Sequence, residues 1–490
     1  MNQKLPKNNK KIIIKVLTIS ICFIFVINTF FINVDASKTK ISKNKTNNLE
    51  TKNSNLTYNL LIISPEEFEK ELLPLVNHKE KHGIKTRLVF LQEIYNQMFW
   101  QGHDNQEQIK YFIKRSIEEW KIKYVLLVGG MKKQSGEWHL PVRYINLDDK
   151  GGLENKYISD LYYADIYDSN GNFSSWDTNN NHIFGEWIGN KSEDKNIDLY
   201  PDVAVGRLAC RNSYEVKSVV NKIINYETLT YGSDWFKKII VATGDPFLDT
   251  DEIEGENGSL LILENMSKFK PIKLWASDGT LKKAYDIIKK INEGCGFLYL
   301  GGHGTPRVWL TYNPNNGKKI KFNKYQMMFL NNYDKLPICI TTGCANNQID
   351  VTIKNLFINP LFSLRPAISS WVPRSFGWKL VSKSNGGSIA TIGNIGEAYG
   401  GKHTSQGVDE SWNGGMGFIT NNFFKAYNQS NLDILGETWN KTIHTYLDNF
   451  PINWDTAAGE ISSIDAKTVQ GWILLGDPSL KIGGYPKPDN

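Results

Sequence analysis

Three residues able to act together on a substrate each follow a short apolar run that ends in glycine. His303 follows "GFLYLGG", Cys344 follows "LPICITTG", and Asp245 follows "FKKIIVATG". A thiol within hydrogen-bond reach of an imidazole is an activated nucleophile, because the ion pair lowers the pKa of the thiol. A carboxylate can hold the imidazole in the productive tautomer. Taken alone, each residue also has a plain explanation as a polar loop residue or a buried thiol.

Glycines surround the histidine in "GGHG", residues 301–304. They let a substrate come close to backbone N–H groups, and such groups bind an oxyanion. In a parallel sheet, polar residues that follow neighbouring strands meet at one edge, where open α/β sheets bind their ligands. The sequence therefore predicts that His303, Cys344 and Asp245 meet at the carboxyl edge of one sheet.

From residue 58 onward, strand-like and helix-like segments alternate. Apolar runs such as "YNLLIIS" and "KYVLLVGG" are separated by segments of helical period such as "NQEQIKYFIKRSIEEW". This order is typical of an α/β protein with a mostly parallel sheet and helices on its faces. A polar interval near 131–200 precedes a second series. We expect two subdomains, 58–232 and 233–485, with the chemistry in the second.

The first 57 residues differ from the rest in charge. They hold ten Lys against Asp35 and Glu50, so the net charge of +6 leaves about −2 for the remainder. Such a body is a poor partner for nucleic acid. A lysine-rich head, an apolar run and "DAS" predict a signal peptide over 1–36, or an uncleaved anchor. Residues 37–57 predict a disordered tether, and the body is expected to be secreted or held at the cell surface. The five cysteines are too few for a disulfide scaffold.

Several segments resemble, in order, the gingipain-like cysteine peptidases, relatives of caspases and legumains. The strongest is "YLGGHGTPRVW", which matches the family's histidine block in type and spacing at Tyr299, Gly302, His303, Gly304 and Trp309. The segments "YPDVAVGRLA", "GGSIATIGN" and "LLGDPSLKI" resemble its central and closing blocks, so the resemblance covers about 58–485. It implies a caspase-like three-layer α/β/α fold and a cysteine endopeptidase that uses no cofactor in its chemistry.

The resemblance also implies roles for the site residues. His303 would be the general base, Cys344 the attacking thiolate, and Asp245 the carboxylate that orients the imidazole. The backbone N–H groups of Gly304 and Cys344 would form the oxyanion hole. The family's "Cys-x-x-Gly-x-Phe" is altered here to "CANNQI", with Asn347 in place of the glycine. A catalytically inactive relative that binds peptides or proteins at a surface therefore stays open as the alternative.

Members of this family often select a basic residue before the cut bond, which needs an acidic group in the pocket. The acidic run 249–256 offers Glu256 for that role, although such a run is usually a solvated loop. Trp309 and Trp371 are further candidates for substrate contact. We expect a monomer whose partner is a protein or peptide substrate, with membrane contact only through the N-terminal segment.

A polar loop offers oxygen ligands at alternating positions, as calcium loops do. The resemblance adds that gingipain-like proteins bind structural calcium. We therefore predict a calcium site, or else a merely polar turn-rich loop, from Asp165, Asp168, Asn170, Asp177, Asn179, Asn181 and Glu186. Calcium-dependent adhesion through residues 160–190 is a further possibility that the sequence leaves open. The motif "HKEKH", by contrast, lacks the glutamate of zinc helices, and we interpret His78 and His82 as an exposed helix face.

Overall fold

The computed structural model describes residues 57–133, 135–148, 154, 156–352, 372–400 and 412–487. The predicted signal segment, all but the last residue of the predicted tether, and Trp371 lie outside these ranges. Among the described residues, none of the helices combines the length and the apolar character needed to cross a membrane.

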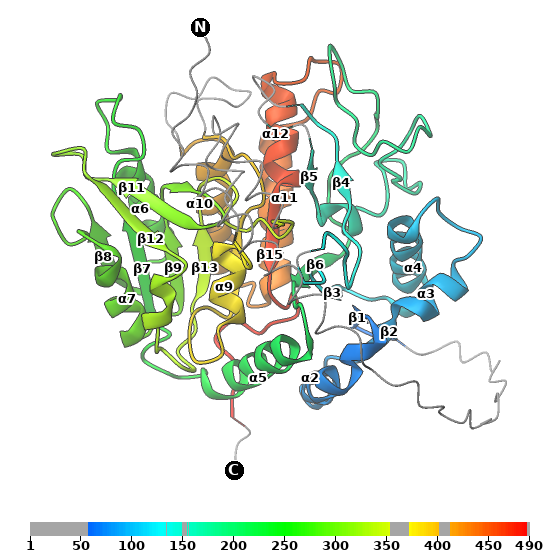
Figure 1. The fold of residues 1–490 in the computed structure, drawn as a ribbon, viewed down its shortest axis with the longest axis horizontal. Coiled ribbons are helices and arrows are strands. Elements are labelled where there is room, and N and C mark those ends of the chain that lie inside the picture. The colour runs from blue at the N-terminus through cyan, green and yellow to red at the C-terminus, as the bar shows by residue number, and fades with distance from the viewer. Residues whose placement is uncertain are drawn as a thin grey trace, which may run out of the picture. The chain divides into compact units, whose positions relative to one another are not determined.

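The centre of the molecule is a ten-stranded sheet (Figure 1). Every neighbouring pair of strands is parallel except β14 and β15. In spatial order the strands are β2 (Thr86–Phe90), β1 (Leu60–Ser64), β3 (Tyr124–Val128), β6 (Ala204–Leu208), β15 (Trp472–Leu475), β14 (Ala390–Asn394), β13 (Ile338–Thr341), β9 (Phe297–Leu300), β7 (Lys238–Thr243) and β8 (Lys270–Trp275). Strands such as β1 and β3 are buried along their whole length, which explains their continuous apolar sequences.

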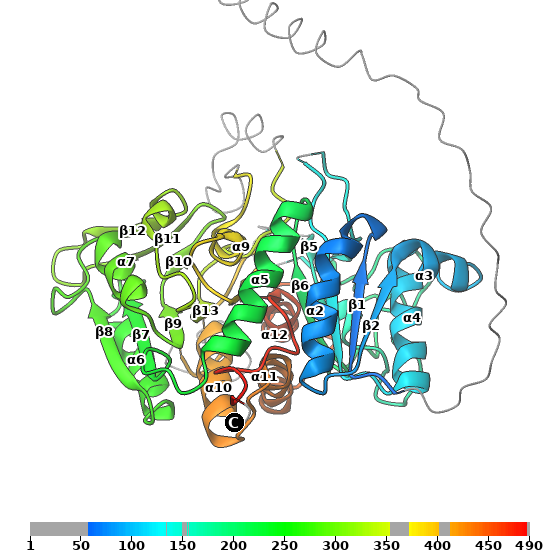
Figure 2. The ribbon, with the colours of Figure 1, turned by 90° about the horizontal axis from the view of Figure 1, so that it is seen from below.

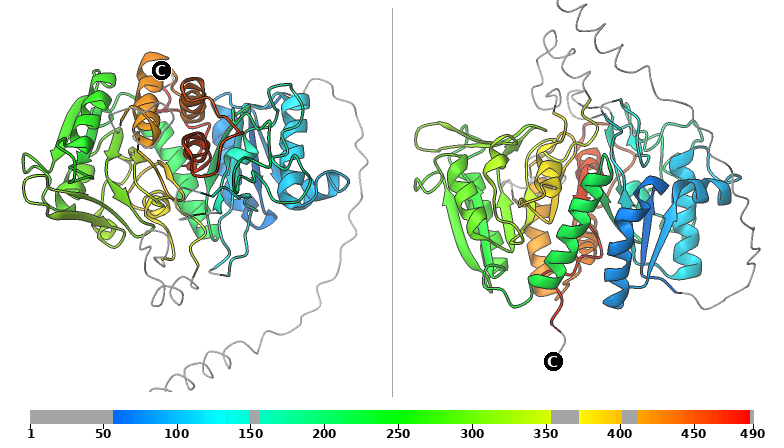
Figure 3. Two further views of the ribbon diagram at one scale, coloured as in Figure 1. Left: turned by 90° about the horizontal axis from the view of Figure 1, so that it is seen from above. Right: turned by 60° about the horizontal axis from the view of Figure 1, so that its bottom comes forward.

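The sheet has two halves that follow the chain. Strands from before residue 232 lie on one side and strands from after it on the other (Figure 3). The halves meet where β15 pairs with β6, and that pairing consists of one register pair, Leu475 opposite Arg207.

Helices cover both faces of the sheet and complete the three layers (Figure 2). One layer contains α2 (Glu69–Lys81), α5 (Ser213–Leu229) and α9 (Phe376–Ser382), which pack side by side. The other contains α6 (Glu254–Asn265), α10 (Gly415–Gln429), α11 (Leu435–Asn449) and α12 (Ile461–Gln470). The remaining helices are α3 (Leu91–Gln97), α4 (Asn105–Trp120) and α7 (Ala284–Glu293), with short 3₁₀ turns η1 (Glu66–Phe68), η2 (Leu161–Tyr163) and η3 (Gln326–Phe329).

Two small antiparallel sheets lie outside the ten-stranded sheet. One consists of β10 (His303–Gly304), β11 (Val308–Tyr312) and β12 (Lys319–Asn323). The other pairs β4 (Tyr144–Ile145) with β5 (Tyr157–Ile158). The first places His303 in a strand that leads away from the edge of the main sheet.

A buried ion cluster holds α2 against α5 and the segment after β15. Lys79 Nζ lies 2.8 Å from Glu227 Oε1 and 2.8 Å from Asp477 Oδ2, and His78 Nε2 lies 2.9 Å from Glu227 Oε2. The predicted exposed face at "HKEKH" is therefore wrong, because α5 covers it. His82 is half-buried and stacks on the ring of Tyr485.

Replacement of Lys79 by Ala would leave the Glu227 and Asp477 carboxylates buried without their cation. We expect the free energy of unfolding to fall by about 3–5 kcal/mol, measured by denaturant titration. Lys81→Ala is the matched control, since Lys81 is exposed on the same helix, and its midpoint should stay within experimental error. Equal midpoints for the two variants would contradict a stabilising role for the cluster.

Candidate active site

Four neighbouring parallel strands end together at one edge of the sheet. In the order β14, β13, β9 and β7, Gly393 pairs with Thr341, Thr341 with Leu300, and Leu300 with Ala242. Cys344 and His303 each follow within three residues of the end of their strand. The register of these strands therefore brings His303 and Cys344 to one carboxyl edge of the sheet, as we expect from the sequence.

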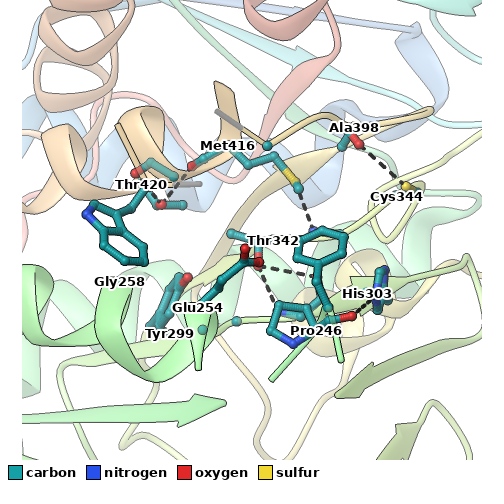
Figure 4. Close-up of a pocket in the computed structure, with 18 residues that line it drawn as sticks. Pro246, Glu254, Gly258, Tyr299, His303, Thr342, Cys344, Ala398, Met416 and Thr420 are labelled. Carbon is teal, nitrogen blue, oxygen red and sulfur yellow. Dashed lines mark hydrogen bonds between the residues drawn. The ribbon is translucent and has the colours of Figure 1, made fainter. Parts of the chain in front are cut away.

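His303 and Cys344 line one pocket of about 230 Å³ (Figure 4). We call it the catalytic pocket, after the role that the sequence predicts for these two residues. Its floor comes from the strand ends and its walls from α6, α10 and the segments beside them. The other lining residues are Pro246, Phe247, Glu254, Gly255, Gly258, Tyr299, Gly301, Gly302, Thr342, Gly343, Ala398, Gly400, Trp412, Met416, Gly417 and Thr420.

The imidazole of His303 is held by a backbone carbonyl. Its Nε2 lies 2.7 Å from the oxygen of Pro246. A carbonyl oxygen only accepts hydrogen bonds, so Nε2 carries the proton and Nδ1 of the neutral ring keeps its lone pair. The edge of Phe247 packs on the ring, with centroids 5.3 Å apart. Nδ1 is therefore the basic nitrogen of this site.

Asp245 does not hold the imidazole itself, which differs from the prediction. Its Oδ1 accepts a hydrogen bond from the N–H of Phe247 at 3.0 Å, and its own N–H donates to Tyr312 O at 3.0 Å. Burial raises the pKa of this carboxyl group. These bonds fix the turn that presents Pro246 O to His303, so the effect of Asp245 on the ring is indirect.

The thiol of Cys344 points toward the segment after β14. Its Sγ donates a weak hydrogen bond to Ala398 O at 3.9 Å (Figure 4). Burial raises the pKa of this thiol, and the carboxylate of Glu397 raises it further. In the part of the chain that the structure describes, no hydrogen bond joins Cys344 to His303. In the structure the thiol and the imidazole line the same pocket, and each is hydrogen-bonded to a different backbone carbonyl.

The turn that carries His303 and the turn that carries Cys344 are in direct backbone contact. A Cβ on Gly304 would lie 2.6 Å from Cys344 O, and a Cβ on Gly343 would lie 2.5 Å from Gly304 N. Gly343 also has φ +108°, which favours glycine. These close approaches explain the glycines of both motifs. They also bring together the backbones of Gly304 and Cys344, the predicted oxyanion-binding pair.

Side chains tie the same two turns to each other. Thr342 Oγ1 accepts a hydrogen bond from Gly302 N at 2.9 Å. Asn346 Nδ2 donates to Thr305 O at 2.8 Å and to Val308 O at 3.2 Å. Because Asn346 is fully buried, its amide fixes the spacing of the two turns.

The residues that replace the usual "Gly-x-Phe" after the cysteine do not enter the catalytic pocket. Asn347 is fully buried, and its Nδ2 donates to Thr391 O at 3.3 Å. Its Oδ1 occupies the space that a Cβ on Gly377 would need. Ile349 is 5% exposed and packs in the main core. Asn347 and Ile349 therefore pack behind Cys344, on the side away from the pocket.

The structure changes the set of substrate-binding candidates. Trp309 is fully buried in the core, because alternate residues of β11 face inward, and it does not line the pocket. The Glu256 carboxylate accepts hydrogen bonds from the N–H and hydroxyl of Ser277 instead of facing the pocket. Glu254, in the first turn of α6, lines it. A carboxylate of the predicted acidic run therefore does line the pocket, but it is Glu254 and not Glu256; substrate binding by this run stays a prediction.

The predicted calcium ligands are mostly engaged in their own turns. Asp168 accepts from Asn170 N and Asn172 N, and Asp177 accepts from Asn181 N and His182 N. Asn179 Oδ1 also accepts from Asn181 N, and Asn181 Nδ2 donates to Glu186.

Asp165 lies apart from that loop surface. It is fully buried, accepts a hydrogen bond from Trp176 Nε1 at 2.8 Å, and has its pKa raised to about 7 by burial, in spite of the nearby Lys110. Within the described ranges, no group of three or more His, Cys, Asp or Glu side chains is placed to hold a metal ion. Calcium binding stays a prediction.

The chain is similar to known proteins over most of its length. The model of peptidase family C25 matches residues 53–483. Gingipain R2 of Porphyromonas gingivalis is 23% identical over 297 residues, which are 59% of this chain and 32% of that protein. Gingipain R1 of the same species is 22% identical over 312 residues, which are 62% of this chain and 25% of that protein. The chain thus spans about a third or less of the length of these relatives.

Solved structures show the same fold. The crystal structure of the Arg-specific cysteine proteinase gingipain R superposes with a TM-score of 0.59 at 18% identity, over 87% of this chain and 78% of that one. A complex of the pro- and mature domains of a Porphyromonas gingivalis gingipain gives a TM-score of 0.56 at 17% identity, over 86% and 79%. The caspase-like α/β fold predicted from the sequence is confirmed, and by the family match the chain belongs to peptidase family C25.

Proposed function

We propose that this chain is an exported cysteine endopeptidase in which Cys344 is the nucleophile and His303 the general acid–base. The observation that carries the proposal is that both side chains follow adjacent parallel strands and line one pocket. Family membership supports the coarser statement that this is a cysteine peptidase. Export rests on the lysine-rich head and apolar run of the N-terminal segment.

The first step is a turn of the thiol from Ala398 O toward Nδ1 of His303. The thiol proton then passes to Nδ1, and the resulting thiolate attacks the carbonyl carbon of the scissile peptide bond. The imidazolium is stabilised by Pro246 O, which accepts from Nε2 at 2.7 Å. The cost of forming the ion pair in a partly buried site is thereby reduced.

The tetrahedral oxyanion is bound by the N–H groups of Gly304 and Cys344. Its collapse breaks the C–N bond, and the amine leaves with the proton from His303 Nδ1, which yields a thioester on Cys344. Water, deprotonated by the same nitrogen, attacks that thioester. The carboxylic acid leaves, and the thiol is restored with the returned proton.

The pocket beside Cys344 suits a positively charged side chain. Glu254 contributes a carboxylate that is 5% exposed, and Tyr299, Trp412 and Met416 contribute ring and thioether surface. A carboxylate in such surroundings pairs strongly with a guanidinium or ammonium group. We infer cleavage after Arg or Lys.

A peptide-binding protein without peptidase activity is the second candidate. It is favoured by one observation: both reactive side chains are bonded to backbone carbonyls, Cys344 to Ala398 and His303 to Pro246. This candidate requires that the thiol keep its proton when a peptide occupies the pocket.

Cleavage of a fluorogenic peptide library, varied at the residue before the scissile bond, separates the two candidates. We expect the wild type to cleave, and Cys344→Ala and His303→Ala to lose at least about 10³-fold in kcat/KM. Cys210→Ala is the matched control, because Cys210 is buried outside the pocket. Binding of peptides by a folded wild type that cleaves none of them would favour the second candidate.

Glu254→Gln keeps the shape of the pocket and removes its charge. We expect kcat/KM for peptides with Arg or Lys before the cut bond to fall about 30-fold or more, and that for neutral peptides to change little. Glu252→Gln is the control, since Glu252 is exposed outside the pocket. An unchanged preference in Glu254→Gln would mean that another group selects the substrate.

The Glu397 carboxylate disfavours the thiolate of Cys344, so Glu397→Gln should lower the pKa of the thiol. The pH midpoint of iodoacetamide alkylation, followed by intact mass, should shift to lower pH in that variant. His303→Ala should not lower the midpoint, because the thiol is hydrogen-bonded to Ala398 O and the raised pKa has its causes in burial and Glu397. A midpoint that Glu397→Gln leaves in place would contradict the described orientation of the thiol.

A further inference from the structure

Five cations gather beside the turn that follows His303. They lie on four segments of the chain, and backbone hydrogen bonds join three of these: Lys324 N donates to Arg307 O at 3.1 Å, and Phe376 N donates to Pro306 O at 2.8 Å. We call this set the basic cluster, and its members are Arg211, Arg307, Lys324, Arg374 and Lys379.

In the ranges that the structure describes, Glu215 is the one carboxylate that pairs with a member of this cluster, and it is already engaged. Glu215 forms an ion pair with Arg374, accepts a hydrogen bond from Arg211 N at 3.1 Å, and is 3% exposed. Among the described residues, no ion pair within 4.0 Å neutralises the other four cations. The chain segment 353–371, just before Arg374 in the sequence, contains no Asp or Glu.

Lys324 is the most buried cation of the basic cluster. This residue is only 8% exposed. In the described part of the chain its Nζ makes no hydrogen bond or ion pair, and it lies 4.8 Å from the ring centroid of Tyr325. Burial and the cations Arg307, Lys379, Arg374 and Arg211 lower its pKa to about 8. A buried cation among like charges is costly unless an anion joins it.

The basic cluster adjoins the catalytic turns on the side away from the catalytic pocket. Arg307 lies in the turn that follows His303 and Gly304, and Asn346, two residues after Cys344, donates to Thr305 O in the same turn. Lys379 lies on α9 and Arg211 just before α5, in the layer opposite to the pocket walls α6 and α10 (Figure 2). A substrate chain that runs over Cys344 along this edge of the sheet would therefore pass close to cations of the basic cluster.

We propose that the basic cluster binds acidic side chains of the protein substrate within about four residues of the cut bond, a reach of about 13 Å in an extended chain. This inference rests on the proposed function, since the site is defined by its place beside Cys344. The substrate would then carry a basic residue for the pocket and Asp or Glu nearby in sequence. Carboxylates would pair with Arg307 and Lys379, and shield Lys324.

The first test measures binding and needs no catalysis. Cys344→Ala protein is titrated with fluorescent peptides that share one Arg and carry two Asp, two Asn or two Lys at positions from four residues before to four after it. We expect the Asp peptide to bind about tenfold more tightly than the Asn peptide in one register. In 1 M salt the preference should fall, because exposed charge pairs are screened.

Charge reversal locates the effect. Arg307→Glu with Lys379→Glu, in the same Cys344→Ala background, should abolish or reverse the order of the Asp and Lys peptides. Lys70→Glu with Lys289→Glu changes the net charge equally at exposed sites on α2 and α7, and should preserve that order. Equal affinity for the Asp, Asn and Lys peptides would overturn the proposal, as would loss of the preference in the control pair alone.

Failure here is distinct from failure of the proposed function. If the wild type cleaves peptides but shows no acidic preference in kcat/KM, the proposed function stands and the basic cluster proposal falls. Preference in binding by the Cys344→Ala protein, together with no cleavage by wild type, would support the cluster and refute the peptidase.

Discussion

The close backbone contact between the histidine turn and the cysteine turn is the constraint on which the site depends. Gly304 and Gly343 leave no room for a Cβ, Thr342 bonds Gly302, and Asn346 bonds Thr305. The parallel pairing of β9 with β13 brings these turns to the same edge of the sheet. The hydrogen bonds of Thr342 and Asn346 then fix the distance between the two turns. The reactive side chains need only rotate about their own bonds, because their backbones are already in place.

Backbone carbonyls control both reactive groups in the resting state. Pro246 O sets the tautomer of His303 and leaves the lone pair on Nδ1, and Ala398 O holds the thiol of Cys344. Burial and the Glu397 carboxylate raise the pKa of that thiol and so favour its protonated form. In the proposed mechanism, a substrate that turns the thiol away from Glu397 would move it from a carboxylate that raises its pKa toward an imidazole that stabilises the thiolate. Occupation of the pocket and activation of the nucleophile are coupled in this account.

Much of the fold follows from the sequence, because buried parallel strands have continuous apolar runs and their glycine-flanked ends carry the polar residues. His303 and Cys344 were predictable on that basis. The orienting group was not, because the turn at Asp245 presents the carbonyl of Pro246, and no sequence pattern marks a carbonyl. The choice between Glu254 and Glu256 depends on where α6 begins, a boundary that periodicity locates poorly.

The remaining differences concern side chains that are buried although the sequence suggests that they are accessible. Trp309 matches a family block, yet the alternation of β11 turns it into the core, so its match reflects packing. His78 lies in a motif that we interpret from the sequence as an exposed helix face, but Glu227 pairs with both His78 and Lys79 in the interior, and Asp477 pairs with Lys79. Pairing of charges across segments separated by 148 residues or more is not visible in local sequence.

The central claim is that Cys344 is the nucleophile that substrate binding activates. The most direct measurement is treatment of the wild-type protein with a peptidyl chloromethyl ketone that carries Arg next to the ketone, so that the thiolate displaces chloride and forms a stable thioether, followed by intact mass and peptide mapping. The account predicts one adduct per chain, on Cys344, and none in His303→Ala under the same conditions. An adduct on another residue, or cleavage of peptides by a protein whose Cys344 stays unmodified, would contradict it.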